Sequence, residues 1–400
     1  PEIGEFVGLL GVLAFIFALL FSVMVHEFGH YITAKKFGMR VTEFFLGFGA
    51  RIWSTQRGET EFGIKAIPAG GYCKISGMTP NEELPDEVKS RAFYKAKTSE
   101  KLIVLGAGSF LHFVLGFLLL FTLFFGIGVN RVLPTITEVV PCVATTNECT
   151  PNDPVSPAKS AGLLVGDEIT GVDGNRELDW EETIAIVRKS AGKELALIVL
   201  RGGSELEIKL TPAARVVDGQ TVGFLGVRNE IGIVKEGPIA ALTLSASTTY
   251  EIVKGSVKAL IGLPSKIPTL FSEAFLGKER DSQGLVGVVG VARVSGETAS
   301  SGNLTTSEKL ATFILLVASL NVFVGIFNLL PILPLDGGHI AVAIYENLRN
   351  KVYRIRGKEI PGPVDVEKLT PITMVVLVLL VALTVVLLFA DIFNPINFNI

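Results

Sequence analysis

The sequence is short of charged residues and of cysteine, and each shortage excludes a class of protein. Charged residues make up 19% of the 400 residues, against 49% hydrophobic residues, a balance that excludes an ordinary soluble enzyme. A net charge of −3 leaves no basic stripe, so we expect no nucleic acid partner. Only three cysteines are present and no second cysteine pair exists, so a cysteine-ligated zinc site is not expected.

The hydrophobic residues are concentrated in four long runs. Each run has about the 20 residues that a helix needs to cross a bilayer. No small-residue cleavage site follows the first run, which we therefore predict to be a span rather than a signal sequence. The sequence thus predicts an α-helical polytopic membrane protein with about four transmembrane helices. The runs are residues 6–25, 102–129, 310–330 and 372–390.

Lysine and arginine gather in the segments that follow the first span, precede the second, and join the third to the fourth. Short loops rich in these residues stay in the cytoplasm, so the polar segment 131–231 is expected outside. Cys142 and Cys149 lie in this outer segment, where an oxidising compartment would allow a disulfide. Cys73 lies in a predicted cytoplasmic loop without an obvious partner.

The first span ends in the pattern His-Glu-x-x-His. His26 and His30 are four residues apart, which places both on one face of a helix. Two neutral imidazoles there can bind one Zn²⁺, and Glu27 can accept a proton from water. The bare pattern also occurs by chance in unrelated proteins. Its place at the end of an apolar span favours function, because an ionisable residue there costs roughly 2.5–3.5 kcal/mol.

A second polar motif follows the third apolar run, where Pro331 and Pro334 interrupt the helical pattern. A carboxylate at membrane depth is tolerated where it lines a cavity or binds something, so Asp336 is the natural third metal ligand. The alternative is that Asp336 caps the helix that starts near His339. His112, alone in the second span, is expected to be a hydrogen-bonded packing residue.

Between the first two spans, β-branched and aromatic residues predict a small hairpin sheet associated with the membrane. Its strands are expected within 41–54 and 60–67, broken by Gly47, Gly49 and the Pro-Ala-Gly-Gly at 68–71. The sheet either simply packs beside the histidine motif or pairs with an extended substrate strand through main-chain hydrogen bonds.

Two further apolar segments do not qualify as spans. Residues 237–262 carry charged residues at helical spacing, which predicts an amphipathic helix on the outer membrane surface. Residues 284–290 are too short to cross a membrane and are punctuated by glycine, which favours a loop or re-entrant role.

The outer segment 131–231 has short strands, turns and one helix, which predict a compact α+β domain of about 100 residues. It contains Ala-Gly-Leu at 161–163, Gly-Asp-Glu-Ile at 166–169 and Val-Asp-Gly at 172–174. This pattern resembles the PDZ domains of bacterial envelope proteases. Such a domain can bind peptide ends by strand addition.

Taken together, the motifs resemble the site-2 protease family of intramembrane zinc metalloproteases. The His-Glu-x-x-His pattern, the PDZ-like segment and the Leu-Asp-Gly-Gly at 335–338 follow one another in the family's order. The resemblance covers essentially the whole chain and is strongest to the single-PDZ bacterial members, especially actinobacterial ones. It implies one Zn²⁺ per chain, with zinc ligands at His26, His30 and Asp336 and with Glu27 as general base. It also implies that Asn328 contacts the substrate or transition state. A substrate-binding membrane β-loop is implied at Gly47, Phe48 and Gly49.

Two stretches depart from the family's pattern. The second span has Ala-Gly-Ser-Phe-Leu-His at 107–112, where the family usually has Ala-Gly-Pro-x-x-Asn. The segment before the third span has Gly-Leu-Val-Gly at 284–287 in place of Gly-Pro-Val-Gly. Neither departure touches the implied ligands.

The resemblance implies hydrolysis of a peptide bond within or near a transmembrane segment of a pre-trimmed membrane protein. The implied partners are membrane lipid, a single-span substrate such as an anti-sigma factor or a signal-peptide remnant, and an upstream site-1-type protease that acts first. The implied location is the bacterial cytoplasmic membrane, with the zinc site toward the cytoplasmic side. The alternative is a non-proteolytic metal transporter or a PDZ scaffold. A transporter would show repeated halves or several intramembrane charges, and a scaffold would not need Glu27.

These expectations divide the chain into seven parts. Residues 1–36 are the first transmembrane helix with the histidine motif, 37–100 the cytoplasmic or re-entrant β-loop region, 101–130 the second transmembrane helix, 131–231 the extracytoplasmic PDZ domain, 232–308 membrane-surface amphipathic helices and a linker, 309–350 the third transmembrane helix with the Leu-Asp-Gly motif, and 351–400 a basic cytoplasmic loop and the fourth transmembrane helix.

Overall fold

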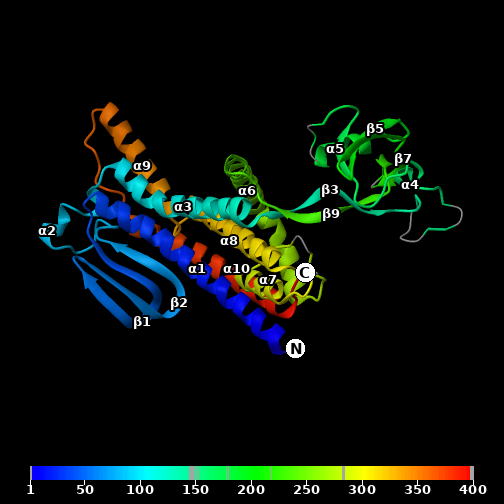
Figure 1. The fold of residues 1–400 in the computed structure, drawn as a ribbon. Helices are drawn as coiled ribbons and strands as arrows, with labels where there is room; N and C mark the ends of the chain where they lie inside the picture. The colour runs from blue at the N-terminus through cyan, green and yellow to red at the C-terminus, as the bar shows by residue number, and fades with distance from the viewer. Residues whose placement is uncertain are drawn as a thin grey trace. The chain divides into compact units, whose positions relative to one another are not determined.

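The computed structural model describes residues 2–143, 149–150, 153–176, 178, 180–217, 219–281 and 284–396. The chain forms two compact units, which Figure 1 shows as ribbons. The first unit joins Pro1–Gly128 to Lys235–Ile400, and the second unit is Val129–Val234. The second unit contains the segment 131–231, for which the sequence predicts a separate domain.

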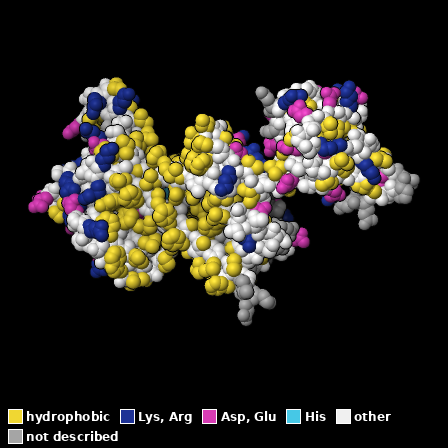
Figure 2. All heavy atoms as spheres, viewed as in Figure 1, with side chains coloured by type: hydrophobic (Ala, Val, Ile, Leu, Met, Phe, Trp, Pro, Cys, Tyr) yellow, Lys and Arg dark blue, Asp and Glu magenta, His cyan; other side chains and the backbone are white. Residues whose placement is uncertain are grey.

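Within the part of the chain that the structure describes, four helices of the first unit are long and apolar enough to cross a membrane. Each overlaps one predicted span, so the prediction of about four transmembrane helices in a multi-pass membrane protein is confirmed. Hydrophobic side chains cover much of this unit in Figure 2. Phe17, for example, is 71% exposed, and such a surface suits lipid rather than water. The helices are Gly4–Lys36, Thr98–Ile127, Thr306–Asn328 and Val366–Phe393.

Helices make up most of the first unit. The long ones are α1 (Glu2–Lys36), α3 (Thr98–Phe121), α6 (Pro238–Phe275), α7 (Val288–Ser300), α8 (Thr306–Asn328), α9 (Asp336–Ile355) and α10 (Thr370–Phe393). The short ones are α2 (Asp86–Lys89), the 3₁₀ helices η1 (Phe93–Lys95) and η3 (Val366–Leu369), and the π-helix η2 (Thr122–Ile127) that extends α3.

The helices between the second and third spans differ from the prediction. The helix expected at 237–262 is longer, because α6 continues through Pro264 and Pro268 to Phe275. A loop or re-entrant role was expected at 284–290, but α7 begins within this stretch at Val288, so the loop alternative is wrong for its last residues.

α7 forms a helix because of a tertiary contact that the local sequence pattern does not reveal. α7 packs against α1, and glycines on both helices let the two backbones approach closely. A Cβ atom at Gly11 would lie 2.7 Å from the carbonyl oxygen of Ser295, and one at Gly296 would lie 2.9 Å from the carbonyl oxygen of Gly8. Tertiary packing therefore overrides the glycine content that predicted a loop.

The third span ends at Asn328, and a short connection with Pro331 and Pro334 leads into α9. Proline cannot donate a backbone hydrogen bond and disfavours helix in the residue before it, so the two prolines favour a break between α8 and α9. Asp336 is consequently the first residue of a new helix.

The sheet beside α1 has two long strands, β1 (Val41–Arg57) and β2 (Thr60–Ile75). Both strands run through the glycines at which the sequence predicts breaks, so the expected breaks are wrong. Each strand instead bends there and changes its pairing partner. The register gives adjacent segments in the order 51–57, 60–65, 41–46 and 71–75. Glycine makes such a bend possible through a positive φ, which is +88° at Gly47.

A small apolar core joins the end of α1, this sheet and the start of α3. Ala34, Val41, Ile75 and Val104 are buried together in it. This core fixes the three elements around the histidine motif, since each contributes a residue to the same cluster.

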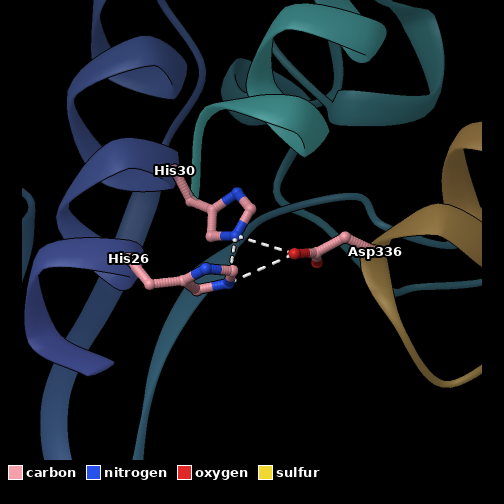
Figure 3. Close-up of side chains that lie close together, drawn as sticks. All are labelled: His26, His30 and Asp336. Carbon is pink, nitrogen blue, oxygen red and sulfur yellow. Dashed lines mark hydrogen bonds and ion pairs between the residues drawn. The ribbon is translucent and has the colours of Figure 1, made fainter. Parts of the chain in front are cut away.

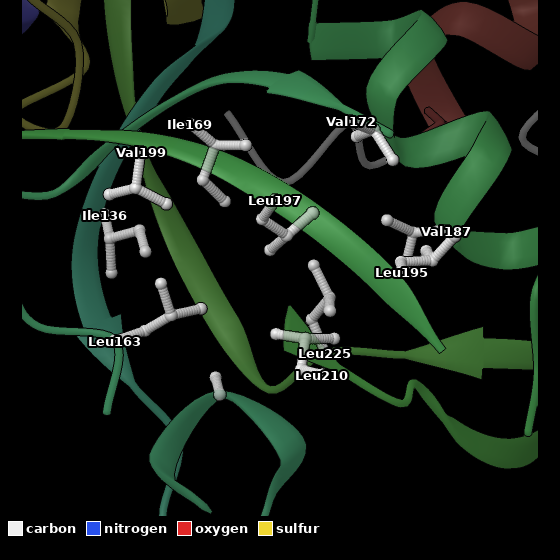
Figure 4. Close-up of a cluster of buried hydrophobic side chains, with 11 residues drawn as sticks. Ile136, Leu163, Ile169, Val172, Val187, Leu195, Leu197, Val199, Leu210 and Leu225 are labelled. Carbon is white, nitrogen blue, oxygen red and sulfur yellow. The ribbon is translucent and has the colours of Figure 1, made fainter. Parts of the chain in front are cut away.

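The second unit is built on a five-stranded sheet in the order β6-β5-β4-β3-β9, with a separate β7-β8 hairpin. β5 directs Leu195, Leu197 and Val199 into the core with the period of two that places every second side chain on one face, and Ile198 on the other face is also buried. These residues meet those of α4, α5 and the other strands in one core (Figure 4). The elements are β3 (Val129–Val139), α4 (Pro157–Ser160), β4 (Glu168–Val172), α5 (Trp180–Lys189), β5 (Leu195–Arg201), β6 (Ser204–Leu210), β7 (Ala213–Val217), β8 (Gln220–Phe224) and β9 (Val227–Val234).

Candidate metal centre

α1 presents the two histidines of the His-Glu-x-x-His motif on one face, one helical turn apart. His26 is 7% exposed and His30 is 8% exposed, so both imidazoles are buried. Their Nε2 atoms lie 3.0 Å apart. The helical spacing of four residues accounts for this proximity.

α9 brings a carboxylate to the same point (Figure 3). The Oδ2 atom of Asp336 lies 3.2 Å from Nε2 of His26 and 3.4 Å from Nε2 of His30. The N-cap position of α9 belongs to Leu335, and no side-chain hydrogen bond caps the helix. The carboxylate therefore faces the histidines, an arrangement that does not favour the capping alternative.

The three atoms form a triangle that suits a small divalent cation. Zinc–ligand bonds of about 2.0–2.1 Å in a tetrahedral site place neighbouring ligand atoms about 3.3 Å apart. The observed separations are 3.0, 3.2 and 3.4 Å. Oδ2 of Asp336 is buried and has no hydrogen-bond partner among the described residues, so a cation held between the three atoms would satisfy this oxygen.

The second ring nitrogen of His30 fixes the tautomer of that imidazole. Nδ1 donates a hydrogen bond to the carbonyl oxygen of Val104 in α3, at 2.8 Å. The proton is then on Nδ1 and the lone pair is on Nε2, the atom that faces Asp336. Nδ1 of His26 is buried without a hydrogen-bond partner in the described part of the chain.

α3 passes directly against the two imidazoles because it has a glycine there. A Cβ atom at Gly108 would lie 2.5 Å from Cε1 of His26 and 2.6 Å from Nε2 of His30. Gly29 allows the same approach from α1, since a Cβ atom there would lie 2.6 Å from the carbonyl oxygen of Ala107. Close contact through small residues is a common way for membrane helices to associate.

A buried polar network adjoins His26 and connects three helices. Nδ1 of His112 in α3 is hydrogen-bonded to Oδ1 of Asn321 in α8 at 2.8 Å, and Nδ2 of Asn321 donates to Oγ of Ser22 in α1 at 3.0 Å. The ring centres of His112 and His26 are 5.0 Å apart. His112 thus lies in a hydrogen-bonded packing position, as the sequence predicts, outside the triangle. Asn321 was missed as a site residue; its only signal is an amide side chain in an apolar span.

Glu27 lies beside the triangle without being part of it. Its carboxylate is close enough to interact electrostatically with His30, His26 and Asp336. It also faces the backbone N–H of Cys73 in β2. A carboxylate in this place can exchange protons with a molecule bound at the open side of a three-ligand metal site.

No described contact joins the other predicted site residues to the triangle. Asn328 is the last residue of α8 and is half-buried, and its side chain makes no hydrogen bond within the described residues. Gly47, Phe48 and Gly49 form the bend of β1. The segment of the sheet that touches α1 near the motif is 71–75, where a Cβ atom at Gly71 would lie 3.0 Å from the sulfur of Met24.

The cysteines are also placed by the structure. Cys142 and Cys149 are joined by a disulfide in the second unit, with their Cα atoms 5.9 Å apart. Cys73 is a free, half-buried thiol whose pKa is raised by burial and, to a smaller extent, by the nearby Glu27. Cys73 is therefore a neutral thiol at physiological pH.

Comparison with known proteins places this geometry in a family. The model of "Peptidase family M50" matches residues 14–367. The chain is 37% identical to zinc metalloprotease Rip1 of Mycobacterium tuberculosis, in an alignment that covers 97% of this chain and 98% of that protein. It is 36% identical to Rip1 of Mycolicibacterium smegmatis over the same shares. It is 26% identical to the regulator of sigma-E protease RseP of Escherichia coli, over 84% of this chain and 90% of that protein.

The matched region includes both halves of the triangle, the motif of α1 and the start of α9. The resemblance to the site-2 protease family is thereby confirmed, and this chain belongs to peptidase family M50.

Proposed function

We propose that this chain is an intramembrane zinc metalloprotease that hydrolyses a peptide bond within or near a transmembrane segment. The observation that supports this most directly is the buried triangle of His26, His30 and Asp336 in a membrane unit, with Glu27 beside it. The three residues would hold one zinc ion and leave a fourth position open. Relatives that are named zinc metalloproteases support the same reaction.

The chemistry divides between the metal and the chain. When bound, zinc supplies Lewis acidity, which makes water a stronger acid near neutral pH and polarises a peptide carbonyl. Glu27 takes a proton from the attacking water as the water oxygen bonds to the carbonyl carbon. Glu27 then gives this proton to the amine nitrogen as the C–N bond breaks. Asn328 donates a hydrogen bond to the carbonyl oxygen as negative charge develops there.

The substrate has to be unwound locally before it is cleaved. The carbonyl groups of a transmembrane helix are hydrogen-bonded within that helix, so they are not free for attack. A strand edge of the sheet can receive an unwound segment through main-chain hydrogen bonds. The 71–75 segment lies against α1 beside Glu27, and Gly47, Phe48 and Gly49 form the bend that would contact the incoming chain.

We assign the second unit to a PDZ-like domain on the outer side of the membrane, where it restricts entry of substrates. It carries none of the proposed metal ligands, so the chemistry does not depend on it. A single-span protein with a bulky outer domain would be excluded, and one already trimmed by a site-1-type protease would be admitted. The name of the sigma-E relatives supports an anti-sigma factor as such a substrate.

The orientation follows from the basic loops. They support a zinc site toward the cytoplasmic side of a bacterial cytoplasmic membrane. The disulfide between Cys142 and Cys149 agrees with an oxidising outer compartment. A metal transporter or a scaffold is less well supported, because neither activity requires Glu27 beside the ligands.

The test is cleavage of a model transmembrane peptide by the purified full chain in detergent or nanodiscs. We expect cleavage that is lost on chelation and restored by stoichiometric zinc. A zinc-loaded, folded preparation that cuts no transmembrane peptide of several sequences would contradict the proposed activity. Deletion of 132–231 separately tests whether the second unit restricts entry of substrates. Untrimmed substrates should then be cleaved. If the deleted protein keeps zinc but no longer cleaves even trimmed substrate, the domain binds peptides instead.

A further inference from the structure

The second half of α9 presents an apolar stripe that the described part of the protein leaves uncovered. Tyr345 is 60% exposed, Leu348 is 56% exposed and Ile355 is 76% exposed. At 3.6 residues per turn, these side chains fall within about 100° of the helix circumference. The exposed members of the stripe are Ile344, Tyr345, Leu348, Val352 and Ile355.

The opposite face of α9 is the one that packs on the protein. Glu346 lies there, and its Oε1 atom pairs with Nζ of Lys101 in α3 at 2.9 Å. Its Oε2 atom accepts a hydrogen bond from the backbone N–H of Val364 at 2.9 Å. Lys101 is buried and Glu346 is largely buried, so this face is fixed and the apolar stripe points outward.

Basic side chains flank the stripe on both sides. By helical spacing, Lys351 and Arg354 lie along one edge, and Arg356, just after the helix, lies along the other. All three are exposed, and none makes a side-chain hydrogen bond or an ion pair within the described residues. Arg349 differs, because its guanidinium donates to the carbonyl oxygens of Pro361 and Gly362. Figure 2 shows Lys and Arg at the free end of α9, at upper left, above a hydrophobic edge.

The chain keeps α9 close to the bilayer. The third span ends at Asn328, a few residues before α9 starts, and the fourth span begins at Val366, shortly after α9 ends. These short connections place the start of α9 and the chain that follows it next to membrane-spanning helices. Lipid is therefore the nearest apolar phase that can cover the stripe.

We propose that α9 binds anionic phospholipid, with the apolar stripe in contact with acyl chains and Lys351, Arg354 and Arg356 at the lipid phosphates. Long basic side chains can lie along an apolar surface while their charged ends reach the headgroups. Each such residue near an anionic leaflet favours binding by about fivefold. Charge complementarity thus selects anionic over zwitterionic lipid. A second copy of the chain would face the same three unpaired positive charges and be repelled.

The test uses the full chain reconstituted in phosphatidylcholine vesicles with spin-labelled phosphatidylglycerol or spin-labelled phosphatidylcholine as the probe. The fraction of immobilised probe gives the relative affinity for the two lipids. We expect wild type to prefer phosphatidylglycerol by about fivefold or more. The triple variant Lys351→Gln, Arg354→Gln, Arg356→Gln should show a preference near one.

The matched control removes the same charge elsewhere on the same predicted side, by Lys89→Gln, Lys95→Gln and Lys97→Gln. It should retain most of the wild-type preference. Zinc content serves as the check that each variant is folded. An unchanged preference in the α9 variant, or an equal loss in the control, would overturn the proposal. A disulfide between two copies of Leu348→Cys in vesicles would also overturn it, because a second copy would then cover the stripe.

Discussion

The two units differ in the kind of side chain that they expose to their surroundings. The second unit buries apolar residues such as Leu197 and Val199 and exposes charged ones, as a domain in water does (Figure 4). The first unit exposes apolar residues such as Phe17 and fully buries Asn321, with His112 almost as deep. The comparison shows where each unit obtains its stability.

In water, burial of apolar surface stabilises a fold by roughly 25 cal/mol per Å². In lipid, this driving force between helices is absent, and association depends on close packing and hydrogen bonds. The first unit uses both, through its glycine contacts and through the network that joins Ser22, Asn321 and His112. A polar metal centre is therefore compatible with the packing of the first unit, whereas it would disrupt the core of the second.

The largest effect should come from Glu27→Gln at the metal centre. We expect peptide cleavage to fall by about 10²–10⁴-fold, because the proton acceptor is lost. Zinc content per chain should stay at the wild-type level, since Glu27 is not in the triangle. Both quantities are measured on one preparation. Near-normal cleavage would contradict the general-base role, and loss of zinc would make Glu27 a ligand.

Leu197→Ala tests the other side of the comparison. Leu197 is fully buried in the core of the second unit, so we expect its unfolding free energy to drop by about 2–5 kcal/mol. Trp180 reports on this unit when Trp53, the other of the two tryptophans, is replaced by Phe. Phe17→Ala is the control in the same background. If it shifts the Trp180 transition as much, the contrast between the units is wrong.

Gly108→Ala should weaken zinc binding. The added Cβ atom would overlap both imidazoles, and overpacking of this kind costs about 1–3 kcal/mol, or about 5- to 150-fold in zinc affinity. Zinc affinity is measured by competition with a chelator. Gly106→Ala is the matched control on the same helix, because a Cβ atom there meets nothing within 4 Å. Equal effects of the two substitutions would contradict a steric role for Gly108.

The second unit should lose stability in acid through Asp167. Its carboxylate is buried and pairs with the guanidinium of Arg201, which holds the pKa of Asp167 below its usual range. The folded state therefore binds this proton less readily than the unfolded state does. The contribution is complete above the ordinary Asp pKa of about 4 and is lost as pH falls below it. Asp167→Asn should lower the stability at pH 7 and flatten this acid dependence, as followed by Trp180 in the Trp53→Phe background. An unchanged acid slope would assign the dependence to other carboxylates.

The smallest effect should be the coupling between Ser22 and Asn321. Hydrogen bonds between membrane helices average about 0.6 kcal/mol in double-mutant cycles. A cycle of Ser22→Ala and Asn321→Ala should give a coupling of that size, measured from unfolding of the full chain in mixed micelles. A coupling near zero would mean that the 3.0 Å contact contributes no stability.

Sequence reasoning recovered the parts of this molecule that depend on local spacing. The four spans follow from length and composition, the proximity of His26 and His30 follows from helical periodicity, and the interruption before Asp336 follows from two prolines. Asp336 lies about three hundred residues after His26 and His30. That it joins them in one site was inferred from chemistry and family resemblance, because no local pattern links α1 to α9.

The features that sequence reasoning missed all depend on contacts between distant segments. Gly108 and Asn321 act through neighbours on other helices, and their local sequence does not show which residues those neighbours are. α7 forms because α1 offers glycines at the contact. The strands bend rather than end at Gly47 because β2 provides a new pairing partner beyond the bend.

The way in which the chain enters and leaves the second unit has a consequence for chain entropy. Val129 and Val234 are paired at the base of the β3–β9 ribbon, and the N–H of Glu236 donates to the carbonyl oxygen of Phe124 at 2.9 Å. The two ends of the inserted segment are thus held together whatever lies between them. The entropic cost of closing a loop grows only with the logarithm of loop length, by about 0.6 kcal/mol for each doubling. The stability of the membrane unit therefore depends little on the size of the insert. Domains can be exchanged, enlarged or removed at this junction without rebuilding the helices around the metal centre.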